Sequence, residues 1–182
     1  MQHINALFLD RDGIVNIDHG YVFKKEHIEF IDDIFLVCKE AVNLNYKLFI
    51  ITNQAGIGRG YYSLEDFYEL TSWIESSFAD RGIKIEKTFF CPHHPKHGKG
   101  VYKKNCSFRK PNPGMLISAS DEFNIDLENS VLIGDKVSDI EAGIAAGVGK
   151  NFILNSSIND KEIYNMPNCF KLKNLIDLKS YL

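Results

Sequence analysis

This 182-residue chain has few cysteines, no long apolar run and no large excess of charge of either sign. No apolar run approaches the ~20 residues that a membrane-spanning helix needs, and the first nine residues do not resemble a signal peptide. The 21 basic and 24 acidic residues nearly balance, which makes nucleic acid a poor partner. We therefore expect a cytoplasmic protein without a membrane or nucleic-acid partner. The four cysteines are too few for a disulfide scaffold, and we expect metal or core roles for them.

Short β-branched and aromatic runs alternate with segments whose apolar residues recur every three or four positions. The runs predict strands over residues 4–9, 47–52, 85–90, 131–134 and 151–154. The helical spacing predicts helices that contain residues 34–42, 67–78, 116–123 and 140–145, with a closing helix over residues 172–182. Strands buried on both faces and joined by helices are typical of an α/β fold with a doubly wound, mainly parallel, Rossmann-like sheet. We expect a single domain over residues 1–182.

Capping residues and loops separate these elements. A proline at position 113 suits the first turn of a helix, and residues 53–60 are rich in glycine and predict a turn. Residues 91–109 have no periodicity and are crowded with Cys, His and Lys, so we expect one long loop there. The expected helix N-caps are Ser63, Asn112 and Ser138.

Two carboxylates directly follow the first predicted strand, in the string Asp10-Arg11-Asp12-Gly13. Asp10 and Asp12 stand where the strand turns into a loop, and Gly13 permits the sharp turn that brings both forward. Taken alone, an Asp at a strand end is equally consistent with a cap or a turn. The pair gains meaning only beside the residues at the other strand ends.

Polar residues also stand at three other loop positions of the predicted sheet. Thr52 ends the second strand, Lys110 follows the long loop, and Asp135 and Asp139 follow the fourth strand. Each alone fits a strand-end hydroxyl, a solvated lysine or the acidic first turn of a helix. Because carboxyl ends of parallel strands share one edge, the carboxylates would form an oxygen site for Mg²⁺, and Thr52 and Lys110 would hold phosphate oxygens. Together they predict a phosphoryl-transfer site.

These residues stand in the order of the four motifs of the haloacid dehalogenase (HAD) superfamily of phosphatases, which the chain resembles over residues 4–150. The resemblance implies a Rossmann-like domain with little cap. Further strings resemble the heptose bisphosphate phosphatases of surface-polysaccharide precursor synthesis, and histidinol-phosphatases are the nearest relatives of that group. Those strings are Asp18-His-Gly-Tyr-Val, Thr52-Asn-Gln-Ala-Gly-Ile-Gly-Arg-Gly, Cys91-Pro-His-His-Pro and Arg109-Lys-Pro-Asn-Pro-Gly-Met.

The resemblance implies a mechanism. Asp10 would attack phosphorus and form an aspartyl-phosphate, and Asp12 would protonate the leaving oxygen and then activate water. We expect apolar surroundings, or the neighbouring Asp10, to favour the neutral form of Asp12. Thr52 and Lys110 would hold the phosphoryl group. The implied Mg²⁺ ligands are Asp10, the backbone carbonyl of Asp12 and Asp135, with Asp139 supporting the metal site.

The implied substrate is a small sugar bisphosphate, D-glycero-D-manno-heptose 1,7-bisphosphate, which would lose its 7-phosphate. Histidinol phosphate is the alternative substrate, and a monomer is expected. The strings around Asp18 and Arg59 and the length of the loop favour the heptose. The residues implied to contact substrate are Asp18, His19, Gly20, Tyr21, Asn53, Gln54, Ala55, Arg109 and Lys136.

The long loop departs from the family pattern. Related enzymes hold a structural Zn²⁺ there through a Cys-x-His pair and a Cys-x-Cys pair. Cys91, His93 and Cys106 match three of these positions, but Phe108 stands at the fourth. Structural zinc is almost always four-coordinate. Either His94 or His97 supplies the fourth ligand, or zinc is absent and Phe108 packs into the interior.

Two other classes of protein use similar parts. A signalling receiver domain also combines a phosphorylatable Asp, a Thr and a Lys on a doubly wound sheet, but its phosphorylated Asp lies on a later strand than its acidic partners. A non-catalytic binding module on this fold is the second alternative. Competent residues at every catalytic position favour an enzyme.

Overall fold

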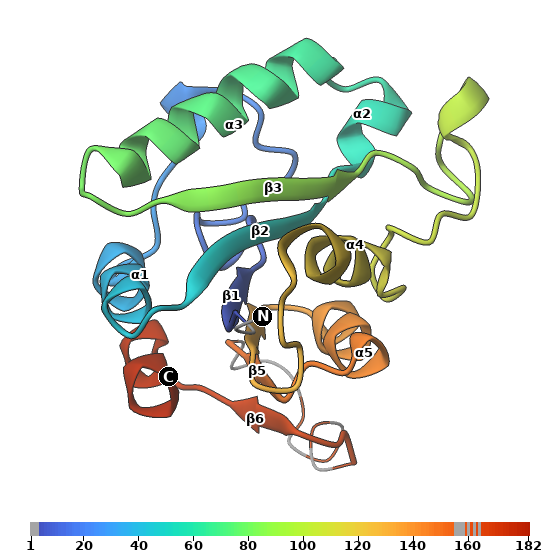
Figure 1. Ribbon diagram of the computed structural model, residues 1–182. Helices are drawn as coiled ribbons and strands as arrows, with labels where there is room; N and C mark the ends of the chain where they lie inside the picture. The colour runs from blue at the N-terminus through green and yellow to red at the C-terminus, as the bar shows by residue number, and fades with distance from the viewer. Residues whose placement is uncertain (1–3, 155–158, 160, 162, 164) are drawn as a thin grey trace.

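The computed structural model describes residues 4–154, 159, 161, 163 and 165–182. Its centre is a six-stranded sheet in the order β3-β2-β1-β4-β5-β6, and all neighbouring strands are parallel (Figure 1). This order is that of a doubly wound sheet and confirms the predicted fold class. The strands are β1 Ala6–Leu9, β2 Lys47–Asn53, β3 Ile85–Cys91, β4 Val131–Gly134, β5 Lys150–Ile153 and β6 Cys169–Lys171.

Helices cover both faces of the sheet. The residues of α1, α3 and the closing 3₁₀ segment pack on one face, and those of α4 and α5 pack on the other (Figure 1). None of the helices in the described ranges is both long and apolar enough to cross a membrane. The helices are α1 Ile34–Asn43, α2 Ala55–Arg59, α3 Leu64–Ala79, α4 Gly114–Phe123 and α5 Val137–Ala146, with 3₁₀ segments at Lys25–His27, Gly100–Tyr102 and Leu175–Tyr181.

Strand β1 at the centre of the sheet is apolar throughout because both of its faces are buried. In β1, Leu7 and Leu9 belong to the core under α1 and α3, whereas Ala6 and Phe8 belong to the core under α4 and α5. Successive side chains of a strand point to opposite faces, so a buried central strand needs apolar residues at every position. The polar residues of the chain are therefore left for the strand ends and loops.

Two predicted loop and helix boundaries are wrong. Residues 53–60 contain the helix α2 in place of a simple turn, and this helix ends at Gly60 with a φ of 77°. Helix α4 has Pro113 as its N-cap, because the side chain of Asn112 donates to the carbonyl of Cys106. The amide of Asn112 fixes the long loop rather than the helix start.

Three further differences lie in the second half of the chain. Lys136, not Ser138, is the N-cap of α5. The backbone N–H of Lys136 donates a hydrogen bond to the carboxylate of Asp139. The closing helix is a 3₁₀ segment that begins at Leu175. Strand β6 was not predicted, since its three residues are only partly buried and show no apolar run.

Replacing Ser63 with Ala should lower the free energy of unfolding by about 1 kcal/mol. Ser63 accepts a hydrogen bond from the backbone N–H of Asp66, and the Asp66 carboxylate accepts one from the N–H of Ser63, which completes a capping box at the start of α3. Urea unfolding measures the change. The control is Ser72→Ala inside the same helix, which should be neutral or stabilising because Ala favours helix interiors. Equal losses in both variants would contradict the role of the cap.

Candidate active site

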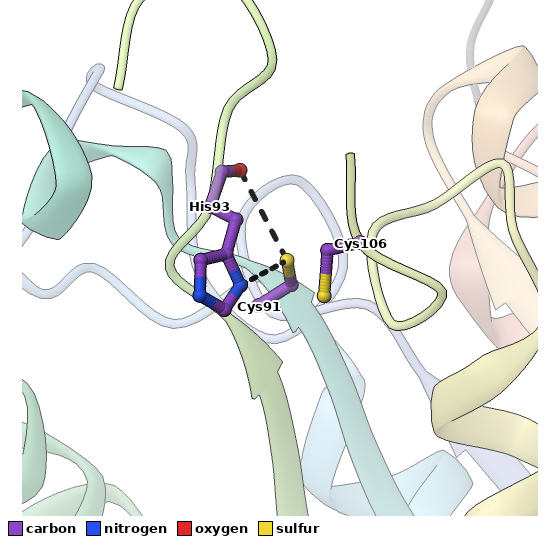
Figure 2. A group of neighbouring side chains, drawn as sticks. All are labelled: Cys91, His93 and Cys106. Carbon is purple, nitrogen blue, oxygen red and sulfur yellow. Dashed lines mark hydrogen bonds between the residues drawn. The ribbon is translucent and has the colours of Figure 1, made fainter. Parts of the chain in front are cut away.

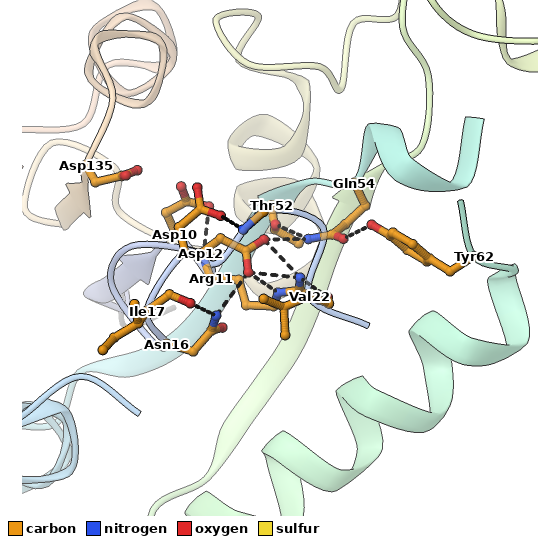
Figure 3. Close-up of polar contacts among 12 residues, drawn as sticks. Asp10, Arg11, Asp12, Asn16, Ile17, Val22, Thr52, Gln54, Tyr62 and Asp135 are labelled. Atoms are coloured by element: carbon orange, nitrogen blue, oxygen red, sulfur yellow. Dashed lines mark hydrogen bonds and ion pairs between the residues drawn. The ribbon is translucent and has the colours of Figure 1, made fainter. Parts of the chain in front are cut away.

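The predicted strand-end residues lie together at the carboxyl edge of the sheet. Asp10 and Asp12 follow β1, Thr52 is near the end of β2, and Asp135 follows β4. The loop between β3 and α4 brings Lys110 to the same place. Figure 3 shows Asp10, Asp12, Thr52 and Asp135 gathered around one site.

Lys110 is the charged centre of this site. Its Nζ lies 2.8 Å from Asp10 Oδ1 and 2.8 Å from Asp139 Oδ1, and it donates to the Ile51 carbonyl at 2.9 Å. Burial lowers the pKa of Lys110, but the two carboxylates outweigh burial and the pKa is raised above its ordinary value. The amide of Asn53 binds both the N–H and the C=O of Lys110, which fixes the backbone beneath the ammonium group. Lys110 is thus a fully charged, immobile cation.

The carboxylates around Lys110 are crowded. Burial, and then the neighbouring Asp139, raise the pKa of Asp10 to about 8. Burial also raises the pKa of Asp135 to about 6. Oxygen atoms of Asp10, Asp135 and Asp139 lie within 4.8 Å of one another, so the single ammonium group of Lys110 does not neutralise all three. A further cation at this place would favour their ionised forms.

The residues around Asp135 fit a Mg²⁺ ion. Gly13 has a φ of 98°, and a Cβ atom at this position would lie 2.4 Å from Asp135 Cγ. Only glycine therefore lets the loop after β1 approach the carboxylate that closely. Carboxylate and carbonyl oxygens are the ligands that Mg²⁺ takes in proteins. Asp139 uses Oδ1 for Lys110 and Oδ2 for the backbone of Lys136, which suits the expected supporting role.

Asp12 has polar surroundings, so the expected apolar environment is wrong. Arg11 forms an ion pair with Asp12 at 2.9 Å through Nη2, and its Nε donates to Oδ1 at 3.1 Å. The amides of Asn16 and Gln54 also donate to the carboxylate, each at 3.1 Å. Arg11 is itself buried and donates to the carbonyl of Val22. Four donor atoms thus fix the orientation of Asp12.

Gln54 joins Asp12 to Thr52. Its Nε2 atom donates to Asp12 Oδ2 at 3.1 Å and to Thr52 Oγ1 at 2.7 Å, and its Oε1 accepts from the hydroxyl of Tyr62 at 2.5 Å (Figure 3). Burial raises the pKa of Tyr62 to about 12, so its hydroxyl is a proton donor near neutral pH. The side chain of Gln54, one of the predicted substrate residues, is engaged with protein groups.

Most other predicted substrate residues form the rim of the site. Lys136 Nζ lies 3.1 Å from Asp18 Oδ2 and 3.7 Å from Asp135 Oδ1, and the backbone N–H of Gly20 donates to Asp18. Burial raises the pKa of Asp18, but the hydrogen bonds from Gly20 and Lys136 lower it below its ordinary value. Tyr21 is exposed at a φ of 53°, with the guanidinium group of Arg59 5.7 Å from its ring centre. This rim is polar and cationic.

Three rim positions contribute in other ways. His19 is exposed and its ring lies 3.4 Å from Glu29, away from the buried carboxylates. Ala55 is the first residue of α2. Arg109 is half-buried and donates to the carbonyl of His93 at 3.1 Å, which ties the segment before Lys110 to the end of β3.

The Cys/His loop brings three potential metal ligands together. The ligand atoms of Cys91, His93 and Cys106 lie within 4.8 Å of one another, with 3.7 Å between Cys91 Sγ and His93 Nδ1 (Figure 2). Burial, with a smaller effect of Cys106, raises the pKa of Cys91 to about 12. The loop geometry therefore matches three of the four implied ligand positions.

The described residues do not complete a closed zinc site. Phe108 packs against the apolar core under α4 and α5, as one of the two predicted alternatives requires. His94 Nδ1 accepts hydrogen bonds from the N–H groups of Lys96 and His97, both at 3.1 Å, which turns this nitrogen toward its own loop. Three donors do not match the four-coordinate geometry of structural zinc, so no step of the chemistry is assigned to it.

Sequence analysis missed Arg11, Asn16 and Tyr62 as parts of the site. Arg11 has 1% of its surface exposed although it is charged. Its position between two aspartates was the available signal, because the Asp-Arg-Asp spacing places a cation beside the carboxylates. For Tyr62 no local pattern pointed inward, since it follows an exposed tyrosine in a glycine-rich stretch.

Comparison with known proteins places this geometry in a family. The chain is 52% identical over 149 residues to D-glycero-alpha-D-manno-heptose-1,7-bisphosphate 7-phosphatase of Burkholderia mallei, covering 82% of this chain and 79% of the relative. It is 42% identical over 176 residues to the enzyme of the same name from Campylobacter jejuni, covering 97% and 94%. This chain belongs to the heptose-1,7-bisphosphate 7-phosphatase family. A family model described as HAD-hydrolase-like also matches residues 107–168.

A solved structure shows that the family shares this fold. The D,D-heptose 1,7-bisphosphate phosphatase from B. bronchiseptica, complexed with magnesium and phosphate, superposes with a TM-score of 0.81 at 22% identity. The match covers 98% of this chain and 97% of that chain. This chain thus has the same fold as that enzyme.

The buried carboxylate of Asp10 should destabilise the magnesium-free protein increasingly as the pH rises. In the unfolded chain Asp10 ionises near pH 3.8, whereas in the folded protein its pKa is about 8. The unfolded state therefore releases its proton first, and folded stability falls between these values. In EDTA, Asp10→Asn should be more stable than the wild type, by a margin that grows from pH 5 to pH 8 in urea unfolding.

Magnesium should reverse this order at pH 8, raising the melting temperature of the wild type far more than that of Asp10→Asn. The control is Asp121→Asn, which removes an exposed carboxylate on α4 and should leave both responses unchanged. A margin that does not vary with pH would contradict the role assigned to Asp10 in this cluster.

Phe108→Cys should complete the zinc site of the long loop. After dialysis against metal-free buffer, we expect the variant to retain about one zinc per chain, and the wild type clearly less, because four donors hold zinc far better than three. Elemental analysis gives the metal content. The control is Phe123→Cys, which adds a thiol elsewhere beside the same core. One tightly held zinc per wild-type chain would refute this prediction.

Proposed function

We propose that this chain is a Mg²⁺-dependent phosphatase that removes the 7-phosphate of D-glycero-D-manno-heptose 1,7-bisphosphate. The observation that carries the proposal is the convergence of Asp10, Asp12, Thr52, Lys110 and Asp135 at one edge of the sheet, in a chain that matches a named heptose bisphosphate phosphatase over 97% of its length. The reaction belongs to the synthesis of nucleotide-activated heptose for surface polysaccharide.

Asp10 is the nucleophile in this proposal. Its Oδ1 atom is held by the N–H of Arg11 at 2.8 Å and by the ammonium group of Lys110 at 2.8 Å. A carboxylate fixed in this way attacks phosphorus without first losing rotational freedom. The resulting aspartyl-phosphate divides hydrolysis into two easier displacements.

Asp12 transfers the protons. In the first step Asp12, in its protonated form, gives its proton to the departing sugar oxygen, and in the second step it regains a proton from the attacking water. Arg11, Asn16 and Gln54 fix the carboxylate for both steps. The same geometry therefore serves the formation and the hydrolysis of the aspartyl-phosphate.

Lys110 and Thr52 stabilise the phosphoryl group in transfer. Lys110 is a buried cation held by two carboxylates, and Thr52 receives a hydrogen bond on its oxygen, which leaves its own hydrogen available to a phosphate oxygen. Mg²⁺, when bound by Asp10, the carbonyl of Asp12 and Asp135, supplies further neutralisation of phosphate charge. Asp139 positions Lys110.

The rim supplies contacts to the rest of the substrate. Arg109 and Lys136 offer positive charge toward the second phosphate, and the Asp18–Tyr21 segment borders the sugar. The proposed substrate contacts are the nine residues that the family resemblance implies: Asp18, His19, Gly20, Tyr21, Asn53, Gln54, Ala55, Arg109 and Lys136. The proposal also includes a cytoplasmic location and a monomer formed by a single domain over residues 1–182.

Purified protein with Mg²⁺ should hydrolyse heptose 1,7-bisphosphate, of either anomer, faster than histidinol phosphate. Asp10→Asn should lose at least about 10³-fold in kcat, because no aspartyl-phosphate can form. Release of inorganic phosphate measures both results. The exposed substitution Asp121→Asn is the control and should retain wild-type activity. Faster turnover of histidinol phosphate would overturn the substrate assignment, and full activity of Asp10→Asn would overturn the nucleophile.

A further inference from the structure

Tyr62 does not touch the reacting atoms in the proposed mechanism. It is linked to Asp12 and Thr52 by hydrogen bonds through the side-chain amide of Gln54. Its hydroxyl donates to Gln54 Oε1 at 2.5 Å, and Gln54 Nε2 donates to Asp12 Oδ2 and Thr52 Oγ1. Tyr62 has 7% of its surface exposed and Gln54 has 2%. The three hydrogen bonds therefore form away from competing water.

A glutamine amide has one accepting end and one donating end, so its orientation matters here. Only one orientation directs the NH₂ group at both Asp12 and Thr52. The Asp12 carboxylate, which only accepts, sets this orientation, and the hydroxyl of Tyr62 stabilises it by donating to the oxygen at the other end. In the reversed orientation the amide oxygen would face the Asp12 carboxylate, and two acceptors would oppose each other.

We infer that Tyr62 is a positioning residue for the proton transfer by Asp12, acting through the amide of Gln54. This inference rests on the proposed function of Asp12. Tyr62 does not touch the substrate in this scheme. It keeps Gln54 in the orientation that holds Asp12 in place.

The contacts that hold the ring of Tyr62 do not involve its hydroxyl group. The ring of Tyr62 stacks on that of Phe23, with centres 5.1 Å apart and an angle of 8° between the planes. A Cβ atom at Gly56 would lie 2.2 Å from Tyr62 Cε1, so the backbone of α2 leaves room for the ring only because this residue is glycine. Phenylalanine at position 62 would keep these contacts and remove the hydroxyl alone.

Removal of the hydroxyl leaves Gln54 Oε1 buried without its donor. The amide then loses the contact that anchors its oxygen end, and its hydrogen bond to Asp12 is weakened. A sugar alkoxide is a poor leaving group and needs the proton of Asp12, whereas p-nitrophenolate leaves without protonation. The two kinds of phosphate ester therefore separate an effect on Asp12 from a general loss of structure.

The test is Tyr62→Phe, assayed by kcat/KM, which reports the steps up to departure of the leaving group. We expect a loss of about tenfold for heptose 1,7-bisphosphate and of less than threefold for p-nitrophenyl phosphate. Tyr68→Phe, at an exposed tyrosine on α3, is the matched control and should change neither value. Equal losses on both substrates would overturn the inference, as would no loss on either.

A double-mutant cycle tests the route through Gln54. In a Gln54→Met background, which removes the amide, Tyr62→Phe should cause no further loss. Additive losses would overturn the inference. Hydrogen exchange of the Gln54 side-chain NH₂, followed by NMR, gives a readout that needs no activity. Exchange should be at least tenfold faster in Tyr62→Phe, and unchanged exchange would overturn the inference even if the proposed substrate proved wrong.

Discussion

The buried ammonium group of Lys110 is the interaction on which this site depends. It contacts Asp10 after β1, the carbonyl of Ile51 in β2 and Asp139 in α5, so one atom joins three elements that are distant in the sequence. A buried lysine is tolerated only where such partners compensate for the loss of water. The carboxylates need the lysine equally, since burial already raises the pKa of Asp10. Lys110 thus offsets part of the cost of burying the carboxylates at this edge of the sheet.

The charges also suit this edge to the phosphate ester of the proposed reaction. Lys110 and, more distantly, Lys136 face three carboxylates, and the remaining negative charge favours a divalent cation beside Asp135. With that cation bound, it and Lys110 would together offset the three carboxylate charges, so that a dianionic phosphoryl group would not be repelled from Asp10. Arg11 and Gln54 meanwhile keep the Asp12 carboxylate fixed at the side of the cluster. Asp10 and Asp12, the proposed nucleophile and proton-transfer group, therefore have distinct environments although only Arg11 separates them in the sequence.

The sequence predicted the parts of this molecule that simple rules govern. Strands such as β1 are apolar at every position because both faces are buried, and parallel strands bring their carboxyl ends to one edge, so the meeting of Asp10, Thr52 and Asp135 followed from the pattern. Strand β6 was not predicted, because a short and largely exposed edge strand has no run of apolar residues. The burial of Arg11 and the polar surroundings of Asp12 were not predicted from the sequence, for another reason. The Asp-Arg-Asp spacing places a cation beside the carboxylates, but the burial of Arg11 and the full donor set of Asp12 also depend on Val22 and Gln54, which tertiary packing brings to the site.

The Cys/His loop shows how backbone packing can hold a segment whose metal-ligand set is incomplete. The N–H of Lys99 donates to the carbonyl of Gly58 at 2.8 Å, which joins the loop to α2. Cβ atoms at Gly58 and Gly114 would lie 2.4 Å from the carbonyl oxygen of Pro92 and 2.5 Å from that of Ser107, so glycines permit close backbone contacts at both ends of the loop. The guanidinium group of Arg109 donates a hydrogen bond to the carbonyl of His93, which joins the two ends of the loop beside Lys110. These contacts hold the segment before Lys110 without requiring a fourth metal ligand at position 108.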